Sequence, residues 1–227
     1  MIGPLHLTGW SDTVEHAGSL YAVQPAQRHA AAQQLAEAGW WIHVDIIVPG
    51  EGPLLGVGLD ELAAVAQDLP EAKVEVHIVD LVGTDRVAAV LDQVLSIGAD
   101  RLVLPSAWCL REGNRVKAHG VQLWAELNRT PLPEYVFADG VVDGVLVMLI
   151  EPGTTQSIDL NRLSAVADLP TDCTIGVDGG VGPHHEAECR AAGVEHLVSG
   201  RALLARPTSS PSIQSQPTRR GTEESRR

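Results

Sequence analysis

The sequence predicts a single α/β domain, a closed (β/α)8 TIM barrel followed by a polar tail. Short β-branched runs alternate with Ala- and Leu-rich amphipathic segments, which is the pattern of parallel βα units. Eight such runs occur within about the first 205 of the 227 residues. Barrels of this type typically need about 250 residues and tolerate about 200. With 44% hydrophobic residues, the chain can bury one large core.

The order of the elements follows from this alternation. The expected strands are residues 4–10, 41–48, 73–81, 101–105, 121–127, 142–150, 173–177 and 195–199, and the clearest helices are residues 26–38, 59–68, 85–97, 160–167 and 184–192. Several helices end in the Gly that is favoured just past a helix C-terminus, as in Ala38-Gly39 and Ala192-Gly193. An open doubly wound sheet is the alternative, but no Gly-x-Gly-x-x-Gly fingerprint of dinucleotide binding follows the first strand.

The composition changes at Pro207. Residues 207–227 are polar and carry four Arg against two Glu, with almost no large apolar side chain. Such a segment cannot bury enough surface to offset its ordering entropy. We therefore expect a barrel domain over residues 1–206 and a disordered tail over residues 207–227.

The charge and cysteine content exclude several classes of partner. The net charge of −13 is spread along the chain, which argues against nucleic acid and anionic membranes because both need clustered positive charge. Cys109, Cys173 and Cys189 are odd in number and have no metal-ligand spacing, so we expect reduced thiols. The N-terminal residues lack a basic stretch followed by a long apolar run, and no run approaches eighteen apolar residues. A cytoplasmic protein is the simplest expectation.

Polar residues with metal-binding chemistry lie in the expected strands. In Trp41-Ile-His43-Val-Asp45-Ile, an imidazole and a carboxylate two residues apart share one face of a strand. Taken alone, this pair is more typical of a solvent-exposed strand end whose side chains are hydrogen-bonded to backbone or water. His77 lies in the third strand and Asp178 follows the seventh. In a barrel the carboxyl ends of the strands converge, so these residues predict a site for one divalent ion such as Zn²⁺, Fe²⁺, Mn²⁺ or Co²⁺.

Five motifs occur in an order and spacing shared with one enzyme family. They are His43-Val-Asp45-Ile, Val76-His77-Ile, Leu123-Trp-Ala-Glu-Leu-Asn-Arg-Thr-Pro131, Val145-Leu-Val-Met148-Leu-Ile-Glu-Pro-Gly153, and Val177-Asp178-Gly-Gly-Val181 with Leu197-Val-Ser-Gly200. Over about residues 2–205 the chain resembles the ribulose-phosphate 3-epimerase family. The resemblance implies a barrel of the ribulose-phosphate-binding type that acts on a small phosphosugar. It also implies that the protein forms a homo-oligomer.

The resemblance also implies roles for the metal-site residues. His43, Asp45, His77 and Asp178 would bind one divalent ion, and Asp45 and Asp178 would act from opposite sides of the substrate C3. Inverting a carbon that bears a hydrogen requires removing the proton from one face and returning one to the other. A carbon acid beside a ketone is too weak for a free carboxylate, so positive charge must neutralise the developing enediolate.

Further residues are expected to contact the substrate. The resemblance implies contacts from His77, Gly179, Gly180 and Gly200, and from Met148 packed over the reacting atoms, although a lone Met also fits a flexible core filler. Thr8, at the end of the first expected strand, takes the place of a family serine and keeps its hydroxyl; a threonine at a strand end is otherwise unremarkable.

The chain departs from the family pattern around the phosphate. A Gly-Gly pair expected after Met148 is replaced by Glu151-Pro-Gly-Thr-Thr-Gln156, and Arg201 follows the last motif where a small residue is usual. The loop from Ile47 onward also differs. Arg201 either binds a phosphate directly, replacing lost backbone donors, or is a solvated residue of an enzyme with a different substrate.

The function expected from these features is a metal-dependent sugar-phosphate 3-epimerase that interconverts D-ribulose 5-phosphate and D-xylulose 5-phosphate or acts on a related ketose phosphate. One rival is a barrel decarboxylase or aldolase, which usually depends on an Asp-x-Lys strand, whereas the only lysines here are Lys73 and Lys117. The other is a diverged barrel kept as a non-catalytic binding protein.

Overall fold

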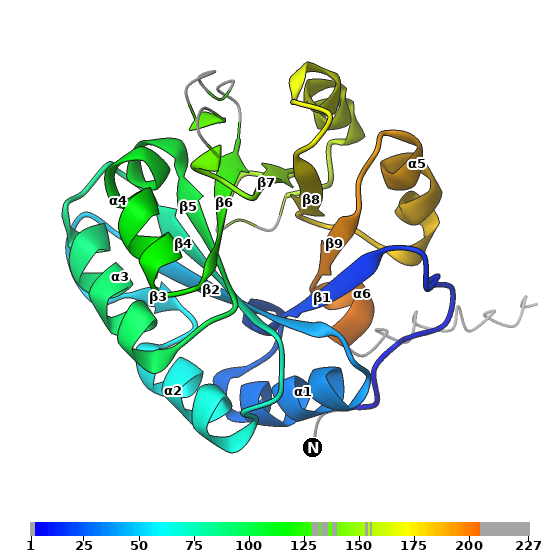
Figure 1. Cartoon of the computed structure of the whole chain (residues 1–227). Helices are drawn as coiled ribbons and strands as arrows, with labels where there is room; N and C mark the ends of the chain where they lie inside the picture. The colour runs from blue at the N-terminus through cyan, green and yellow to red at the C-terminus, as the bar shows by residue number, and fades with distance from the viewer. Residues whose placement is uncertain are drawn as a thin grey trace, which may run out of the picture.

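Eight parallel strands close into a barrel in the computed structural model, which describes residues 3–128, 132, 136–137, 140–152, 154 and 156–204 (Figure 1). The strands are β1 (Glu15–Ser19), β2 (Trp41–Val48), β4 (Val74–Asp80), β5 (Arg101–Pro105), β6 (Gln122–Leu127), β7 (Gly144–Met148), β8 (Thr174–Asp178) and β9 (His196–Ser199). Each pairs in parallel with its neighbours, and pairing of β1 with both β2 and β9 closes the ring. The short β3 (Leu55–Gly56) runs antiparallel to the end of β2. The predicted TIM barrel is confirmed.

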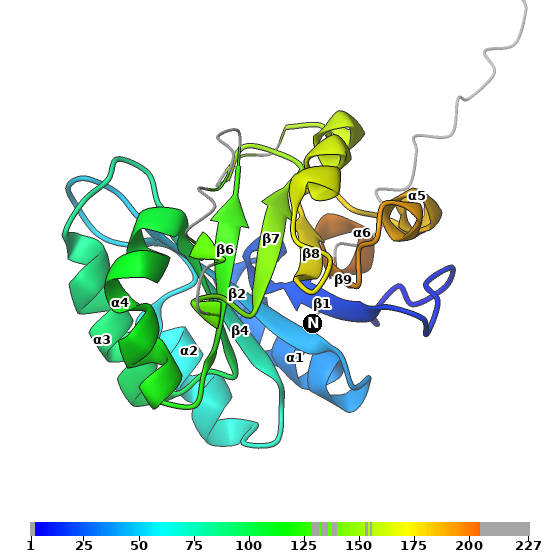
Figure 2. The same ribbon diagram turned by 45° about the horizontal axis from the view of Figure 1, so that its top comes forward.

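Helices surround the strands, as Figures 1 and 2 show. They are α1 (Pro25–Glu37), α2 (Leu59–Asp68), α3 (Arg86–Ile97), α4 (Ser106–Ala118), α5 (Glu186–Ala191) and α6 (Arg201–Leu204), with 3-10 segments η1 (Leu20–Ala22), η4 (Leu160–Asp168) and η5 (Pro183–His185). The start of α2 is fixed by Glu61, whose carboxylate accepts a hydrogen bond from the Gly58 N–H at 2.8 Å. The predicted helix over residues 160–167 is a 3-10 segment instead.

The first strand lies later in the chain than the sequence predicted. Residues 4–10 form a turn-containing segment, and the strand is β1, Glu15-His-Ala-Gly-Ser19. This stretch has no β-branched residue, because close packing favours small side chains there. A Cβ on Gly18 would lie 2.5 Å from Cδ2 of Leu35, so Gly18 lets α1 pack directly on β1. Because the segment lacks the β-branched residues that are typical of strands, its composition did not predict a strand.

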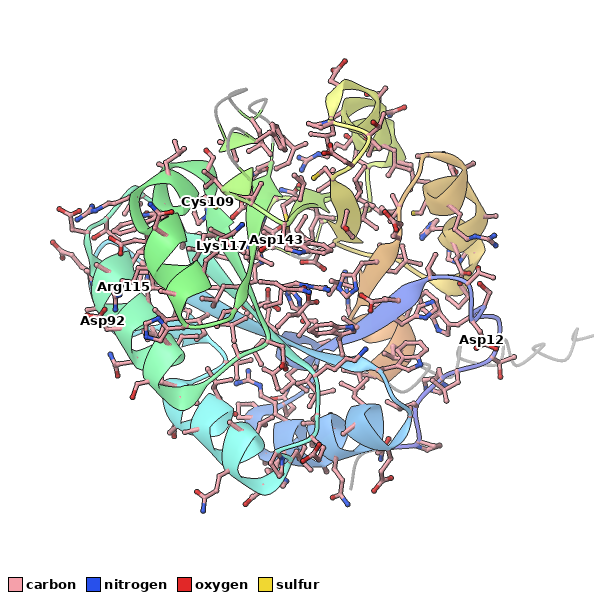
Figure 3. The ribbon with its side chains drawn as sticks, in the orientation of Figure 1. Asp12, Asp92, Cys109, Arg115, Lys117 and Asp143 are labelled. Atoms are coloured by element: carbon pink, nitrogen blue, oxygen red, sulfur yellow. The ribbon has the colours of Figure 1, made fainter. Side chains whose placement is uncertain are left out.

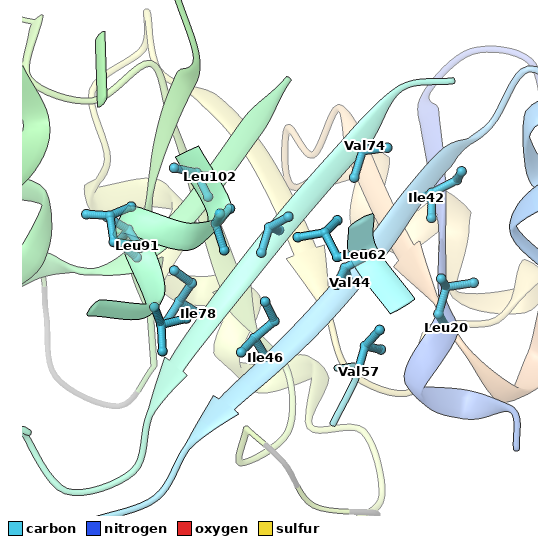
Figure 4. Close-up of a cluster of buried hydrophobic side chains, with 14 of the residues drawn as sticks. Leu20, Ile42, Val44, Ile46, Val57, Leu62, Val74, Ile78, Leu91 and Leu102 are labelled. Carbon is cyan, nitrogen blue, oxygen red and sulfur yellow. The ribbon is translucent and has the colours of Figure 1, made fainter. Parts of the chain in front are cut away.

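Alternate residues of each strand face the helices or the barrel interior. On β2, Ile42, Val44 and Ile46 are fully buried against the helices, in the cluster of apolar side chains drawn in Figure 4. The intervening positions face inward. The interior apolar cluster comprises Ala17, Trp41, Val103, Trp124, Leu146, Met148 and Val198. Because all eight residues of β2 are buried, the polar side chains of His43 and Asp45 must find partners inside the barrel.

Gly176 of β8 leaves the space that the interior aromatic rings occupy. A Cβ at this position would lie 2.7 Å from the Trp124 ring and 3.2 Å from the ring of His196. We expect Gly176→Ala to lower the free energy of unfolding by about 1–3 kcal/mol, because overpacking forces neighbouring side chains from their preferred positions. Urea unfolding followed by circular dichroism measures this loss. An unchanged midpoint would show that the interior yields more easily than the structure indicates.

Charged residues on the outer surface join neighbouring elements. Arg115 of α4 pairs with Asp92 of α3, and Lys117 Nζ lies 3.2 Å from Asp143 Oδ1 (Figure 3). Such exposed pairs contribute little stability, so the fold depends on the two cores described above. The predicted tail, residues 207–227, lies outside the described residues. None of the helices in the described part of the chain is long and apolar enough to span a membrane.

Candidate metal centre and active site

The carboxyl ends of three strands bring together the four predicted metal ligands. Asp45 and His77 are direct partners in the register of β2 and β4, and Asp178 ends β8 across the barrel. One ligand atom from each of His43, Asp45, His77 and Asp178 can be chosen so that all lie within 4.8 Å of one another. His43 Nε2 is 3.1 Å from Asp45 Oδ1, and His77 Nδ1 is 3.5 Å from the same oxygen. The two histidines are fully buried.

The donor set fits a divalent ion. His77 Nδ1 is buried and has no hydrogen-bond partner, although it lies among the other three ligands. A buried imidazole nitrogen without a partner costs free energy unless something binds it. Two imidazoles and two carboxylates are ligands that Zn²⁺, Fe²⁺, Mn²⁺ and Co²⁺ accept in proteins. The residues present could therefore hold such an ion.

Burial and the mutual interactions of the four side chains shift their pKa values. Burial would lower the pKa of His77, but Asp45 and Glu126 raise it to about 9. Burial also opposes the charge on His43, yet Asp45 and Glu75 raise its pKa well above the ordinary value. Burial raises the pKa of Asp178 to about 6, against the opposing effect of His43 and His77. Protons thus occupy this centre at neutral pH in the absence of an ion, and an ion must displace them.

Asp45 has a second partner that the sequence analysis missed. Ser19, the last residue of β1, donates a hydrogen bond from Oγ to Asp45 Oδ2 at 2.8 Å. Ser19 takes the strand-end position predicted for Thr8. Thr8 is exposed in the turn before β1 and is not among the residues that line the cavity described below, so its predicted placement at a strand end is wrong. The misplaced first strand caused both errors.

A cavity of about 710 Å³ opens above the four ligands. Asp45, His77 and Asp178 line it, whereas His43 lies beneath. The structure brings the other predicted substrate residues to the same cavity, namely Met148, Gly179, Gly180, Gly200 and Arg201. Its size suits a small ligand. Ser19, Tyr21, Ala22, Val79, Ile150, Pro152, Thr154, Val181 and Ala202 complete the lining.

Glycines shape one wall of this cavity. Gly179 has a φ of +113°, a conformation that other residues rarely adopt, and a Cβ there would lie 2.8 Å from the backbone nitrogen of Ile150. A Cβ on Gly200 would lie 2.9 Å from the Cβ of Ala22. Close packing against Ile150 and Ala22 therefore requires glycine at these two positions of the cavity wall. Arg201 follows directly and is exposed at the cavity.

The end of β7 is fixed by a partly buried cation from the next segment. Arg162 of η4 donates from Nη1 to the carbonyl oxygens of Met148 at 2.7 Å and Ile150 at 3.0 Å, and to Asn128 Oδ1 at 3.2 Å. Met148 is 2% exposed. Both Met148 and Ile150 are thereby held at the cavity wall. Pro131 and Gly153, which belong to the sequence motifs, lie outside the described residues.

Two carboxylates behind the histidines were also missed. Glu75 Oε1 lies 2.9 Å from His43 Nδ1, and Glu126 Oε2 lies 3.2 Å from His77 Nε2. Both occupy inward positions of their strands, two residues before His77 and Asn128. The alternation of strand faces could have found them, since acidic residues at buried inward positions need partners.

Comparison with known proteins relates the chain to one family. The family model described as "Ribulose-phosphate 3 epimerase family" matches residues 15–204, starting where β1 starts. The chloroplastic ribulose-5-phosphate-3-epimerase of Arabidopsis thaliana is 30% identical over 184 residues, covering 72% of this chain and 62% of that protein.

Solved structures of other barrel enzymes share the fold. A 3-hexulose-6-phosphate synthase matches with a TM-score of 0.57 and 20% identity over 83% of this chain and 90% of its own. A mutant tryptophan synthase α-subunit from Pyrococcus furiosus matches with a TM-score of 0.60 and 14% identity over 85% and 89%. The structural likeness shows the barrel, while the match over residues 15–204 shows more: the chain belongs to the ribulose-phosphate 3-epimerase family.

Proposed function

We propose that this protein is a metal-dependent sugar-phosphate 3-epimerase that interconverts D-ribulose 5-phosphate and D-xylulose 5-phosphate or acts on a closely related ketose phosphate. The observation that carries the proposal is the convergence of two imidazoles and two carboxylates within 4.8 Å at the floor of the cavity. Family membership supports an epimerase-type reaction. The name of the Arabidopsis relative supports the five-carbon substrate.

The reaction needs two groups that exchange a proton with C3. Asp45 and Asp178 both line the cavity and come from strands on different sides of the barrel, β2 and β8. One carboxylate removes the C3 proton as a base, and the other returns a proton to the opposite face as an acid. A divalent ion held by His43, Asp45, His77 and Asp178 would supply positive charge to the substrate oxygens as the enediolate forms.

The environments of the two carboxylates already differ. Burial would raise the pKa of Asp45, but His43 and His77 hold it well below its usual range, whereas burial raises the pKa of Asp178 to about 6. Two carboxylates with separated pKa values are typical of an acid–base pair. The Ser19 hydroxyl, hydrogen-bonded to Asp45 Oδ2, keeps that carboxylate oriented.

Arg201 is the proposed phosphate-binding residue. Its guanidinium carries a permanent charge next to the Gly200 backbone on the cavity wall. We expect Arg201→Ala to raise KM for a ketose phosphate by about 10- to 100-fold, which corresponds to losing one charged hydrogen bond. Activity on the unphosphorylated ketose should not change.

Steady-state kinetics with the phosphorylated and free sugars measures this effect. Arg190→Ala, an exposed arginine of α5, is the matched control and should behave as wild type. Equal losses with both sugars, or an unchanged KM for the phosphate, would contradict the assignment.

A lysine-dependent reaction finds no support in the structure. Lys73 lies just before β4, at the opposite end of the barrel from the cavity, and Lys117 of α4 pairs with Asp143 on the outer surface. Neither is at the cavity. Together with the four converging ligands, this favours epimerisation over a decarboxylase or aldolase reaction that uses a lysine.

The proposed function is tested by turnover of a panel of ketose phosphates and their unphosphorylated forms, with the protein loaded with Zn²⁺, Fe²⁺, Mn²⁺ or Co²⁺ in turn. We expect C3 epimerisation of ribulose 5-phosphate or a related ketose phosphate with at least one ion. Tight binding of a ketose phosphate without epimerisation of any panel member would favour the non-catalytic binding protein instead.

A further inference from the structure

The histidine ligand His43 is linked to a charged cluster inside the barrel. Glu75 is fully buried, and its Oε1 lies 2.9 Å from both His43 Nδ1 and His196 Nε2. Its other oxygen accepts a hydrogen bond from Arg101 Nη1 at 3.1 Å. Every oxygen of this buried carboxylate is thus engaged, and its position is fixed from three sides.

Two aromatic rings contact Arg101, the cation of this cluster. The guanidinium carbon of Arg101 lies 4.0 Å from the ring centroids of both Trp41 and Trp124. The His196 ring meets the same two tryptophans edge to face. Rigid rings on strands β2 and β6 therefore restrain Arg101 and His196, and these restrain Glu75. A buried carboxylate remains charged only when it is paired in this way.

The second histidine has a comparable but simpler partner. Glu126 of β6 lies with Oε2 3.2 Å from His77 Nε2, and its side chain is 11% exposed. In both pairs the carboxylate contacts one ring nitrogen, which leaves the other nitrogen toward the ligand cluster. These other nitrogens are Nε2 of His43, which lies 3.1 Å from Asp45 Oδ1, and Nδ1 of His77, which is buried without a hydrogen-bond partner.

These contacts matter because an imidazole binds an ion through one nitrogen only when the other keeps its proton. A carboxylate that accepts that N–H fixes the tautomer and the ring orientation and makes the ligand nitrogen more basic. We infer that Glu75 and Glu126 are positioning residues, each of which orients one histidine of the proposed metal site, His43 and His77 respectively. The inference rests on the proposed function only in so far as the four ligands bind an ion.

The test compares ion affinity in the stripped full-length protein. We expect Glu75→Gln and Glu126→Gln each to weaken binding of Zn²⁺ and Co²⁺ by about 10- to 100-fold, measured by competition with a chromophoric chelator. The visible spectrum of the Co²⁺ protein should change, because the ligand field depends on ring orientation. Glu75→Asp, which keeps the charge that Arg101 and His196 require, provides the Glu75 measurement if Glu75→Gln does not fold.

Glu15→Gln is the matched control. Glu15 Oε2 contacts the same cluster, at 3.3 Å from Arg101 Nη2 and 3.6 Å from His196 Nδ1, but contacts neither His43 nor His77. It should retain wild-type affinity. Unfolding midpoints of the ion-free variants, compared with their affinities, separate positioning from general loss of structure.

Two outcomes distinguish the inference from the proposed function. If wild type binds Zn²⁺ and both glutamine variants bind it with equal affinity and an unchanged Co²⁺ spectrum, the positioning roles are wrong and the metal site stands. If wild type binds neither ion, the metal site itself is wrong, and the positioning roles fall with it. Weakened binding in the variants but not in Glu15→Gln supports the inference.

Discussion

Asp178→Asn is expected to lower the rate of C3 epimerisation by roughly 10²–10⁴-fold or more, and Asp45→Asn is expected to do the same. The physical reason is that an amide can neither accept nor deliver the proton. Both residues line the cavity, and they come from strands β2 and β8. Loss of either leaves a single base, which can only return a proton to the face from which it came.

The two variants should differ from each other in a way that a single kinetic constant does not reveal. In deuterated water, each variant should lose exchange of the C3 hydrogen with one epimer of the substrate and retain some exchange with the other. The affected epimer should be opposite in the two variants. Nuclear magnetic resonance of each isolated epimer measures this exchange.

Because Asp45 and Asp178 are also proposed ligands, ion content must be measured in the same preparations. Asn keeps one oxygen that can ligate an ion, so partial loading is expected and can be corrected for. Asp85→Asn, whose side chain is 90% exposed in wild type, is the control for removing a surface carboxylate. Undiminished epimerisation in either active-site variant, at full ion loading, would exclude the mechanism with two bases.

The fold was largely predictable because buried parallel strands have a strong signature. All eight residues of β2 are buried, and its β-branched run was predicted with the same bounds, Trp41–Val48. β1 was missed for a physical reason. Its Ala17 and Gly18 are small because α1 and the interior rings pack closely there, and packing of this kind is absent from a local pattern. An α-helix and a 3-10 segment are likewise indistinguishable by apolar spacing, as η4 shows.

In the candidate site, too, some residues could be predicted from the sequence and others could not. His43, Asp45, His77 and Asp178 were predicted because their type and strand position are both visible in the sequence, and the structure brings them together. Ser19 was missed with β1. The roles of the individual residues, the cytoplasmic location and the homo-oligomeric state stay predictions.

Glu75 and Glu126 were missed for a different reason. Strand alternation shows that both side chains face inward, but it does not show their partners. Glu75 and His43 are 32 residues apart and Glu126 and His77 are 49 residues apart, so the pairs appear only once the strands lie together in the sheet. Long-range hydrogen bonds of this kind leave no local pattern that identifies the partner.

Removing the ion with a chelator is expected to abolish turnover and to lower the melting temperature, and both effects should depend on pH in a defined direction. An ion present at about 1,000 times its Kd stabilises the fold by about 4 kcal/mol. The ion competes with protons on the ligands. His77 has a pKa of about 9 without an ion, and the pKa of His43 is raised well above its ordinary value, so both must lose a proton when an ion binds.

Apparent affinity should therefore rise between pH 6 and pH 9, by about tenfold per pH unit for each proton released. Below about pH 6, Asp178 also takes up a proton, and affinity should fall more steeply. The ion-free protein should show the reverse trend. The raised pKa of His77 contributes stability that is present below the ordinary histidine pKa and is lost as the pH rises through about 9.

The gap in melting temperature between loaded and stripped protein should consequently widen from pH 6 to pH 9. Differential scanning calorimetry at fixed free Zn²⁺ measures it, and proton release on Zn²⁺ binding can be counted by calorimetry in buffers of different ionisation enthalpy. A gap that does not change with pH, with no protons released, would mean that the ion does not bind at His43 and His77. Such a result would remove the positive charge on which removal of the C3 proton depends, and with it the basis for epimerisation at this site.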